Sequence, residues 1–501
     1  MRRKRRQACL AVLRQTFGIS GFRPGQKAAV NALLSGRDVL CILPTGAGKS
    51  LCWQLPAVMQ RGLTVVVSPL IALMDDQVQS LRRRGVPAET LNSLMTAQER
   101  QDVVRQVRDG RVRILLVSPE RLETQAFQQL CQACPPWLVV VDEAHCVVQW
   151  GDEFRPVYAR IGDFVRSLPD RPVICAMTAT ADSRMQRQIV RSLGMAFHKR
   201  VMLPVLRENL TYDVRTTARP LQAILQLMAQ EPVKTVVFCR SRRHTELLAA
   251  ALEAAGLAAG YYHAGLDRAG RERQQERFRT GETQILTATT AFGMGVDIPD
   301  VRRVIHADLP DSITDLVQQS GRAGRDGRPA RCVILLTPDN LLHTAEAFRE
   351  MRGAAMLRPL LYLRFHRRVW RPAQELLNLL ATQECITAGI SAAFGQLAAP
   401  CGRCSACLRG PAAMAVPDLM RTDEYGLRLW LLRLQRDALA KRRGVAAHAL
   451  IGDVALMHIA RELAMPEIAD GEVRSALERL LTVFRGQAVR KAHAEKTGSA
   501  S

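Results

Sequence analysis

The amino-acid sequence predicts an α/β protein with two parallel sheets followed by a helical region. Two segments, 38–178 and 234–337, alternate short runs of β-branched residues with longer amphipathic stretches. This alternation is typical of parallel strands joined by helical crossovers. After Pro338 these runs stop, and the rest of the chain is helical in pattern and basic. Because single cores stop growing well below 501 residues, we expect several domains.

Each expected strand is a short apolar run bounded by a turn or an amphipathic stretch. In the first segment the strands are expected at 38–43, 64–68, 114–118, 138–141 and 172–178. In the second segment they are expected at 234–239, 284–289, 302–307 and 331–337. We place the break between the two segments near 201–214, where the periodicity lapses around Pro204.

The same pattern divides the chain into consecutive parts. They are a first lobe (1–202), a second lobe (203–338), a cysteine-bearing helical module (339–409), a linker (410–424), a small helical domain (425–490) and a tail (491–501). The linker is placed where proline, glycine and alanine become frequent, in LRGPAAMAVPDLM.

The charge of the chain favours a polyanionic partner. Lysine and arginine total 70 against 47 acidic residues, which gives a formal charge of +23. Nucleic acid and an acidic membrane surface both suit this charge, and a protein that is merely rich in arginine is the remaining alternative. No apolar run approaches the roughly 20 residues that cross a bilayer, so we expect an intracellular protein without a membrane partner. Most of its 13 cysteines should then be free.

The segment LPTGAGKS follows an expected strand and should open a helix, which is the context of a phosphate-binding loop. Gly46 and Gly48 let backbone amides curl around phosphates, Lys49 neutralises the terminal phosphates, and the Ser50 hydroxyl can ligate Mg²⁺. Leu43 stands where the usual pattern has its first glycine. The loop therefore needs support from a second element.

Asp142 and Glu143 supply that support at the end of the strand 138–141. Asp142 can hold Mg²⁺, and Glu143 can orient or deprotonate the attacking water. In the second segment, QQSGRAGRDG carries Arg322 and Arg325 one helical turn apart, where they could stabilise charge on a γ-phosphoryl group as arginine fingers. An acidic pair that ends a strand and an arginine pair on a solvated helix face are the alternatives.

Four late cysteines have the spacing of a zinc site, C-x₁₅-C-x₂-C-x₂-C. They are Cys385, Cys401, Cys404 and Cys407. The glycine and serine spacers of CGRCSAC let the chain fold around a tetrahedral metal, and a redox role is the alternative. Cys131 and Cys134 form a lone C-x₂-C, which we expect to be structural.

Taken together, the motifs resemble those of the RecQ family of superfamily 2 helicases from about residue 17 to residue 407. The matching pieces are FRPGQ (22–26), LPTGAGKSLCWQLPA (43–57), SPLIALMDDQV (68–78), DEAHCVVQWGDEFRPVY (142–158), TAT (178–180), FCRSRR (238–243), YYHAGL (261–266), TATTAFGMGVDIPDVR (287–302) and SGRAGRDG (320–327).

The resemblance implies two RecA-like lobes that pinch ATP·Mg²⁺ between them. Arg23 and Gln26 would read the adenine, and Asp297 of the second lobe would face the nucleotide, with Arg322 and Arg325 as fingers. One departure is Ile19, which stands where the family commonly has an aromatic that stacks on adenine. Adenine binding is then expected to be weaker.

The resemblance also gives the loop after the acidic pair a role. In this family it binds single-stranded DNA and links that contact to hydrolysis, so Trp150, Phe154 and Arg155 would carry the coupling. Base stacking on an aromatic contributes about 1–3 kcal/mol and tolerates any sequence, which suits a motor. The alternative is Trp150 as a core residue. Asp152 replaces the family's usual histidine and is expected to alter the DNA contact or its coupling.

The late part of the chain resembles the family in some modules only. The cysteine cluster is similar to the family's Zn²⁺ module, although Ile386 and Thr387 replace an arginine pair. The winged helix that often follows, with its strand-splitting hairpin, has no room here. The segment 425–490 looks like a helicase-and-RNaseD C-terminal (HRDC) domain, with Asp453 as an expected N-cap.

The expected function is that of an ATP-dependent 3′→5′ DNA helicase in DNA repair or recombination, with direction implied by the resemblance alone. Expected partners are single-stranded and forked DNA, together with single-strand-binding or recombination proteins, and the chain is expected to be monomeric and cytoplasmic or nucleoid-associated. Three alternatives remain. They are a translocase or annealing ATPase with weak unwinding, a zinc-stabilised DNA-binding scaffold with a vestigial ATP site, and an RNA helicase.

Overall fold

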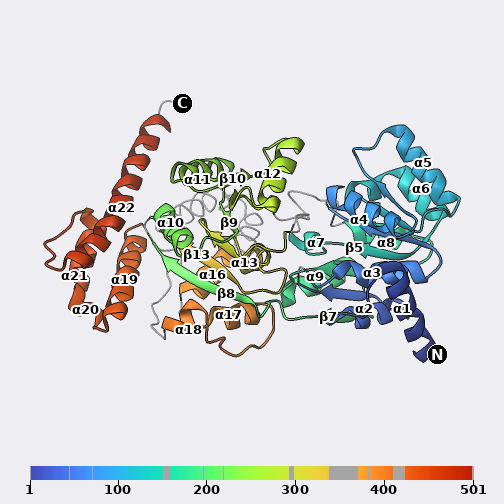
Figure 1. Ribbon diagram of the computed structural model, residues 1–501, viewed down its shortest axis with the longest axis horizontal. Coiled ribbons are helices and arrows are strands. Elements are labelled where there is room, and N and C mark those ends of the chain that lie inside the picture. Colours follow the sequence, from blue (N-terminus) through green and yellow to red (C-terminus); the bar gives the residue numbers. More distant parts are fainter. Residues whose placement is uncertain are drawn as a thin grey trace. The chain divides into compact units, whose positions relative to one another are not determined.

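The computed structural model describes residues 2–44, 46–69, 71–149, 158, 160–195, 197–217, 219–292, 298–337, 370–381, 384–409 and 424–498. These residues form two compact units (Figure 1). The first unit runs to Arg207 and takes in the late segment Ser391–Leu397. The second unit runs from Glu208 to Ile390 and from Ala398 onwards. The zinc-module segment expected at 339–409 is thus shared between the units.

The first unit is built on a seven-stranded parallel sheet. Its strands are β1 (Val39–Ile42), β2 (Leu63–Val67), β3 (Ala88–Leu91), β4 (Ile114–Val117), β5 (Pro136–Val141), β6 (Val173–Thr178) and β7 (Lys199–Met202). They are ordered β3-β4-β2-β5-β6-β1-β7. Because all of these strands are parallel, the loops that follow them lie at one edge of the sheet, where open α/β sheets bind ligands.

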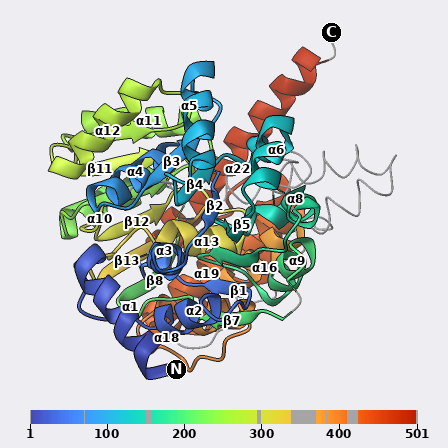
Figure 2. The same cartoon turned by 90° about the vertical axis from the view of Figure 1, so that its right-hand side faces the viewer.

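Helices cover both faces of this sheet. They are α1 (Arg2–Phe17), α2 (Gln26–Leu33), α3 (Lys49–Met59), α4 (Ile71–Arg83), α5 (Ala97–Arg108), α6 (Gln125–Ala133), α7 (Cys146–Gln149), α8 (Ile161–Ser167) and α9 (Ser183–Ser192), with a 3₁₀ turn at Pro119–Glu123. On one face Trp53 of α3 is buried against the strands. On the other, Phe127 of α6 and Phe164 of α8 lie with ring centroids 5.7 Å apart. Figure 2 shows α3 and α8 on opposite sides of these strands.

The second unit contains a six-stranded parallel sheet, ordered β10-β11-β9-β12-β13-β8. Its strands are β8 (Leu210–Thr216), β9 (Thr235–Phe238), β10 (Ala259–Tyr262), β11 (Ile285–Ala288), β12 (Arg303–His306) and β13 (Ala330–Leu336). Its helices are α10 (Pro220–Gln230), α11 (Arg242–Ala254), α12 (Arg268–Thr280) and α13 (Ile313–Ser320). Leu227 of α10 and Leu252 of α11 pack against one face of the sheet.

The expected α/β class with two parallel sheets is confirmed, and every expected strand is present. Four further strands, β3, β7, β8 and β10, were not expected. All four lie at the edges of their sheets. An edge strand buries fewer side chains, so its sequence lacks the continuous β-branched run of a central strand. In β8, for example, buried residues alternate with partly exposed ones.

After β13 the described chain is helical, as expected. The helices are α16 (Arg371–Ala381), α17 (Ile386–Ala393), α18 (Ser405–Arg409), α19 (Glu424–Arg443), α20 (Ala447–Leu450), α21 (Asp453–Glu462) and α22 (Gly471–Gly498). Helix α19 packs against α20, α21 and α22. Most of the expected linker, 410–423, lies outside the described residues.

One local expectation in this region is wrong. Asp453 is not the N-cap of α21, because Gly452 holds that position. The Asp453 carboxylate instead accepts hydrogen bonds from Arg436 Nη1 (2.6 Å) and Arg433 Nη2 (3.1 Å) of α19. The Asp453 carboxylate therefore links α21 to α19 by ion pairs and does not cap α21. Within the described ranges, no helix combines the length and the apolar character needed to cross a membrane.

Candidate nucleotide site and zinc site

The phosphate-binding loop lies between β1 and α3, as the sequence predicts. Gly46 and Gly48 adopt φ angles of 85° and 75°, which side-chain-bearing residues rarely accept. Helix α3 begins at Lys49, and Ser50 is its second residue. The free N–H groups at this helix start, with Lys49 beside them, form a site suited to an anion.

Two side chains near the start of α2 hold this loop in place. Arg23 Nη1 donates to the Gly46 oxygen at 2.7 Å. Gln26 Nε2 donates to the main-chain oxygens of Ala47 (3.2 Å) and Gly48 (3.0 Å), and its Oε1 accepts from Arg23 N (2.8 Å). Sequence reasoning missed this role, because the contacting residues are more than 20 positions apart. The adenine-reading role of Arg23 and Gln26 stays a prediction.

Glycine is required at position 48 by its neighbours as well as by its φ angle. A Cβ atom there would lie 2.5 Å from Gln26 Nε2. The loop is therefore packed directly against the Gln26 amide. Lys49 Nζ turns back onto the loop and donates to the Leu43 oxygen at 3.3 Å.

Asp142 and Glu143 follow β5, two strands away from β1 in the sheet. Burial, together with the charge of Glu143, raises the pKa of Asp142 to about 6, and the Lys49 ammonium opposes this rise. Because β1, β6 and β5 run parallel, the Lys49 loop after β1 and the acidic pair after β5 lie at the same edge of the sheet. A desolvated carboxylate beside a phosphate loop is a ligand suited to Mg²⁺.

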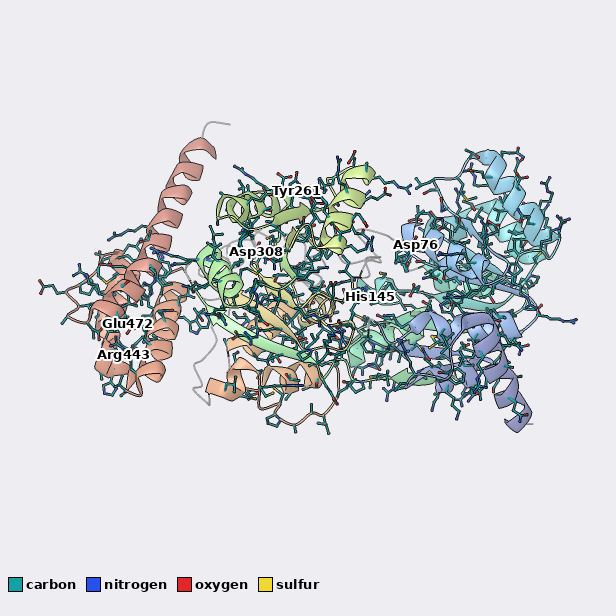
Figure 3. All side chains as sticks on the ribbon, in the orientation of Figure 1. Asp76, His145, Tyr261, Asp308, Arg443 and Glu472 are labelled. Carbon is teal, nitrogen blue, oxygen red and sulfur yellow. The ribbon has the colours of Figure 1, made fainter. Side chains whose placement is uncertain are left out.

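His145 links the acidic pair to the loop that follows β6. Its Nδ1 lies 3.0 Å from Thr178 Oγ1 and 3.3 Å from Glu143 Oε2 (Figure 3). The Thr178 hydroxyl already donates to the Thr180 oxygen (2.9 Å), so it accepts from a protonated Nδ1. Burial alone lowers the pKa of His145, but hydrogen bonds with Cys146 and Glu143 raise it to about 10.

The remaining predicted nucleotide and DNA residues fall in two groups. Trp150, Phe154, Arg155 and Asp297, together with Asp152, lie outside the described residues. Arg322 and Arg325 belong to the second unit, where they lie in a turn and not on a helix. Helix α13 ends at Ser320, and Gly324 adopts a φ of 61°. The alternative of a solvated helix face is therefore wrong, while the finger role stays a prediction.

The four late cysteines converge as predicted. Their Sγ atoms all lie within 4.8 Å of one another, and those of Cys385 and Cys404 are 4.0 Å apart. Zn–S bonds of about 2.3 Å in a tetrahedron place the sulfurs about 3.8 Å apart, so the set fits zinc. Main-chain amides support the sulfurs: Cys401 N donates to Cys385 Sγ (3.2 Å) and Cys404 N to Cys401 Sγ (3.3 Å). Donors of this kind favour thiolates, the form that binds metal.

The segment between the first and second of these cysteines packs into the first unit. Gln396 Nε2 donates to the Leu203 oxygen (2.9 Å), and its Oε1 accepts from Val205 N (3.0 Å). Gly395, with φ 72°, lies so near α9 that a Cβ would be 2.8 Å from Ser183 Oγ. The amide of Gln396 thus pairs with main chain on both sides of Pro204.

A second cluster of metal-binding residue types, Cys239, His244 and Asp308, lies at the carboxyl end of the second sheet. Asp308 Oδ2 is already occupied: it accepts from Arg240 N (2.8 Å) and lies 2.6 Å from His244 Nδ1. Burial raises the pKa of Cys239 far above its usual range, so the thiol stays protonated. The cluster is therefore explained by an ion pair between His244 and Asp308 beside a protonated thiol. Cys131, whose pKa burial raises to about 12, is likewise an inert core thiol.

Comparison with known proteins places this geometry in a family. The model of the DEAD/DEAH box helicase family matches residues 23–188, and that of the helicase conserved C-terminal domain matches residues 219–327. An "ATP-dependent DNA helicase RecQ" of Haemophilus influenzae is 41% identical over 330 residues, which cover 66% of this chain and 53% of that protein. The chain thus spans about half the length of this relative.

A relative of the same name from Synechocystis is 38% identical over 341 residues, which cover 66% of this chain and 71% of that protein. Among solved structures, the helicase Lhr of Mycobacterium smegmatis bound to single-stranded DNA and AMP-PNP has a TM-score of 0.54 at 18% identity, covering 89% of this chain and 72% of that one. This structural likeness concerns the fold alone. Motifs, geometry and relatives agree, and the chain belongs to the RecQ helicase family.

Proposed function

We propose that the chain is an ATP-dependent DNA helicase that moves 3′ to 5′ along single strands. The single observation that carries this proposal is that the Lys49 loop and Asp142 follow parallel strands and so lie at the same edge of the first sheet. Relatives named as ATP-dependent DNA helicases support the choice of reaction and substrate. The net charge of +23 suits a polyanionic track.

In this proposal the first unit holds ATP and Mg²⁺. The α3 N-terminus and Lys49 bind the β- and γ-phosphates, while Ser50 and Asp142 hold the metal. Glu143 orients the attacking water, and the contact of His145 with Glu143 helps to fix that carboxylate. Mg²⁺ would supply charge neutralisation between the phosphates when bound.

The remaining roles come from the resemblance. Arg322 and Arg325 stabilise charge that develops on the γ-phosphoryl group, and Asp297 of the second lobe faces the nucleotide. Trp150, Phe154 and Arg155 contact single-stranded DNA and transmit that contact to Asp142. Hydrolysis is then fast only when a strand is bound.

We infer that Cys385, Cys401, Cys404 and Cys407 hold Zn²⁺ in a structural role. The cluster closes a loop that carries α17 and orders the start of α18. A structural zinc site of this type contributes its binding free energy directly to folding. The helical region 425–490 is proposed as an HRDC-like contact module, and the chain as cytoplasmic or nucleoid-associated and monomeric.

Measuring ATP hydrolysis with and without single-stranded DNA tests the function. We expect DNA to stimulate hydrolysis at least about 10-fold, and Lys49→Ala to abolish the stimulated rate by removing the phosphate contact. Identical rates with and without DNA would refute a DNA motor. Equal hydrolysis by Lys49→Ala and the unchanged chain would instead favour a scaffold with a vestigial ATP site.

A second candidate is a translocase or annealing ATPase with weak unwinding. From Trp370 to Gly498 the described residues form helices and no strand, so they include no strand-splitting hairpin. Strand separation on forked, blunt and Holliday-type DNA distinguishes the two. Stimulated hydrolysis without strand separation would select the translocase.

The choice between DNA and RNA needs its own measurement. Competition of each nucleic acid for ATPase stimulation compares them directly. We expect single-stranded DNA to stimulate at lower concentration than RNA of the same length, and the reverse order would favour an RNA helicase. Forked DNA and single-strand-binding or recombination proteins remain the proposed partners.

A further inference from the structure

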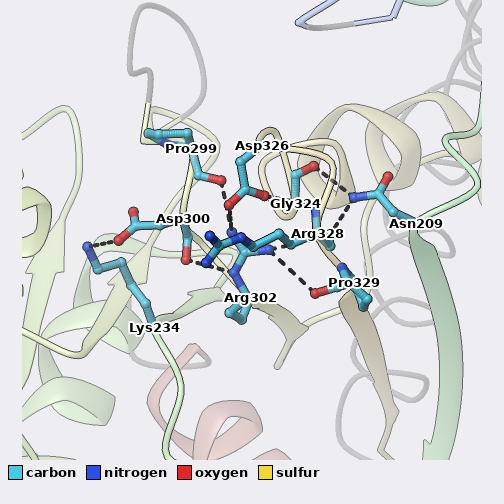
Figure 4. Close-up of polar contacts among 9 residues, drawn as sticks. All are labelled: Asn209, Lys234, Pro299, Asp300, Arg302, Gly324, Asp326, Arg328 and Pro329. Carbon is cyan, nitrogen blue, oxygen red and sulfur yellow. Dashed lines mark hydrogen bonds and ion pairs between the residues drawn. The ribbon is translucent and has the colours of Figure 1, made fainter.

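The turn that carries Arg325 is held by Arg302, which directly precedes β12 (Figure 4). All five N–H groups of the Arg302 guanidinium are used. Its Nε donates to the oxygen of Asp300 (3.2 Å), Nη1 to the oxygens of Arg328 (3.3 Å) and Pro329 (3.4 Å), and Nη2 to the oxygen of Pro299 (3.2 Å) and to the Asp326 carboxylate.

This arrangement joins two loops that are distant in the sequence. Pro299 and Asp300 lie before β12, whereas Asp326 to Pro329 lie before β13. In this arrangement the side chains of Arg302 and Asp326 are 20% and 26% exposed. The Arg302 guanidinium holds the pKa of Asp326 below its usual range. The carboxylate therefore stays ionised and bound at neutral pH.

Asn209 holds the same turn from the side of β8. Its Nδ2 donates to the oxygens of Gly324 (2.8 Å) and Arg328 (2.7 Å), which uses both amide hydrogens. Gly324 adopts a φ of 61°, and a Cβ there would lie 2.5 Å from Asn209 Nδ2. The backbone before Arg325 is thus fixed by close packing as well as by hydrogen bonds.

Asp300 and Arg302 are in turn bound to residues around the second sheet. Lys234 Nζ pairs with Asp300 Oδ2 (2.7 Å) and donates to the Arg279 oxygen at the end of α12 (3.2 Å). Arg302 N donates to the Lys234 oxygen at 2.9 Å, next to the β9–β12 ladder. The turn is therefore held against the amino ends of the central strands β9 and β12.

We propose that Arg302 and Asn209 are positioning residues that set the aim of the Arg325 guanidinium for ATP hydrolysis. Both neighbours of Arg325 are held, Gly324 by Asn209 and Asp326 by Arg302. The inference rests on the proposed finger role of Arg325. A group that stabilises a transition state must be held to a fraction of an ångström, and a misplacement of 1 Å lowers a rate by as much as about 100-fold.

The substitution Arg302→Lys tests this proposal, because lysine keeps the charge but its single nitrogen cannot span acceptors on two loops. We expect the maximal DNA-stimulated kcat to fall about 10-fold or more, while the KM for ATP changes less than about 2-fold. DNA affinity and the far-UV spectrum should be unchanged. Arg268→Lys, which disturbs an exposed ion pair with Glu272 on α12, is the matched control and should leave kcat unchanged.

Combining variants separates this proposal from the proposed function. If Arg325→Ala slows hydrolysis and Arg302→Lys adds nothing to that loss, the proposal is supported, because both changes remove one effect. If Arg302→Lys leaves kcat intact while Arg325→Ala lowers it, the finger stands and the positioning role falls. An additive double variant also overturns the positioning role. An unaffected Arg325→Ala protein refutes the finger and, with it, this inference.

A second variant covers the case in which Arg302→Lys fails to fold. Asn209→Asp keeps the shape of the side chain but replaces the NH₂ group by a carboxylate oxygen. This oxygen cannot donate and would face the Gly324 and Arg328 oxygens. The same fall in kcat at constant KM is expected. A folded Asn209→Asp protein with an unchanged kcat overturns the proposal.

Discussion

Position 48 has room for a hydrogen atom and for nothing larger. The Gln26 amide occupies the space where a side chain would begin, and the same amide binds the main chain of the phosphate loop. The loop conformation thus depends on a residue that lies on a different helix. Nucleotide affinity should respond to this packing independently of the phosphate contacts of Lys49.

A comparison of two glycine substitutions tests this dependence. Gly36 has nearly the same φ as Gly48, 74° against 75°, but open space around it. Gly36→Ala should lower the free energy of unfolding by about 1–2 kcal/mol, because alanine is strained at positive φ. Gly48→Ala should lower it by at least as much, because its Cβ also meets the Gln26 amide. Only Gly48→Ala should also weaken ATP binding, by about 10-fold or more, as measured by titration with a fluorescent ATP analogue. Equal nucleotide affinities would show that the Gln26 contact is unimportant.

His244 near the start of α11 and Asp308, two residues after β12, form a pair whose strength depends on pH. The hydrogen bond with Asp308 raises the pKa of His244, although burial opposes the rise. The pKa of Asp308 is lowered despite burial, through His244 and Arg240. The stabilising effect of His244 is present below its unfolded pKa of about 6.5 and is lost as pH rises through the folded value. That of Asp308 is present above about pH 3.9 and is lost as pH falls.

A double-mutant cycle of His244→Gln and Asp308→Asn measures this pair. We expect a coupling free energy of less than about 1 kcal/mol at pH 6, because the histidine is partly exposed, and a smaller one at pH 9. Urea unfolding at the two pH values gives both numbers. The asparagine side chain of the second variant keeps an oxygen that can accept from Arg240 N, so the cycle isolates the histidine. Equal coupling at pH 6 and pH 9 would contradict the assignment of charge.

At the scale of elements, the sequence identifies the central strands and misses the edges. The segment 138–141 becomes the buried end of β5, because a strand that is covered on both faces must be apolar throughout. The edge strand β7, KRVM, exposes its first two residues and offers no such run. The hydrophobic pattern therefore identifies the central strands of each sheet but not its edge strands.

In the candidate site, too, the sequence predicts what is formed by residues close together in the chain and misses contacts between distant residues. Spacing along the chain predicts the phosphate loop and the cysteine cluster, because neighbours in sequence form them. The hydrogen bonds of Gln26 to the phosphate loop and those of Arg302 to the turn before β13 are tertiary contacts, which no local sequence pattern predicts. The adjacent residue Arg303 is fully buried and donates to main-chain oxygens at the end of α10, among them that of Leu227 (3.1 Å). Two neighbouring arginines thus look alike in sequence and serve different elements.

Metal removal tests the cysteine cluster as an element. The purified chain should contain about one zinc ion, and Cys404→Ser should release it and lower the free energy of unfolding by more than about 3 kcal/mol. Elemental analysis and thermal unfolding measure the two effects. Cys134→Ser is the control, since it changes a cysteine outside the cluster and should leave the zinc content unchanged. Full zinc occupancy in Cys404→Ser would show that another residue replaces this ligand.

At the scale of the whole molecule, the excess of basic residues should govern the affinity for DNA. Each phosphate contacted on a single strand contributes about −0.7 to the slope of log affinity against log salt concentration. Three or more contacts along the chain predict a slope of about −2 or steeper. Fluorescence anisotropy with a labelled oligonucleotide between about 50 and 200 mM salt measures it. A slope near zero would mean that non-ionic contacts dominate.

The late segment Ser391–Leu397 also determines when the first unit can finish folding during translation. It completes the first unit, whose earlier part ends at Arg207. At about 5–20 residues per second, a ribosome needs roughly 10 to 40 s to make the intervening chain. Until Gln396 has been made, the main-chain groups of Leu203 and Val205 lack the side-chain amide that they pair with in the folded chain. The first unit is therefore begun first during translation but completed only after most of the second has left the ribosome.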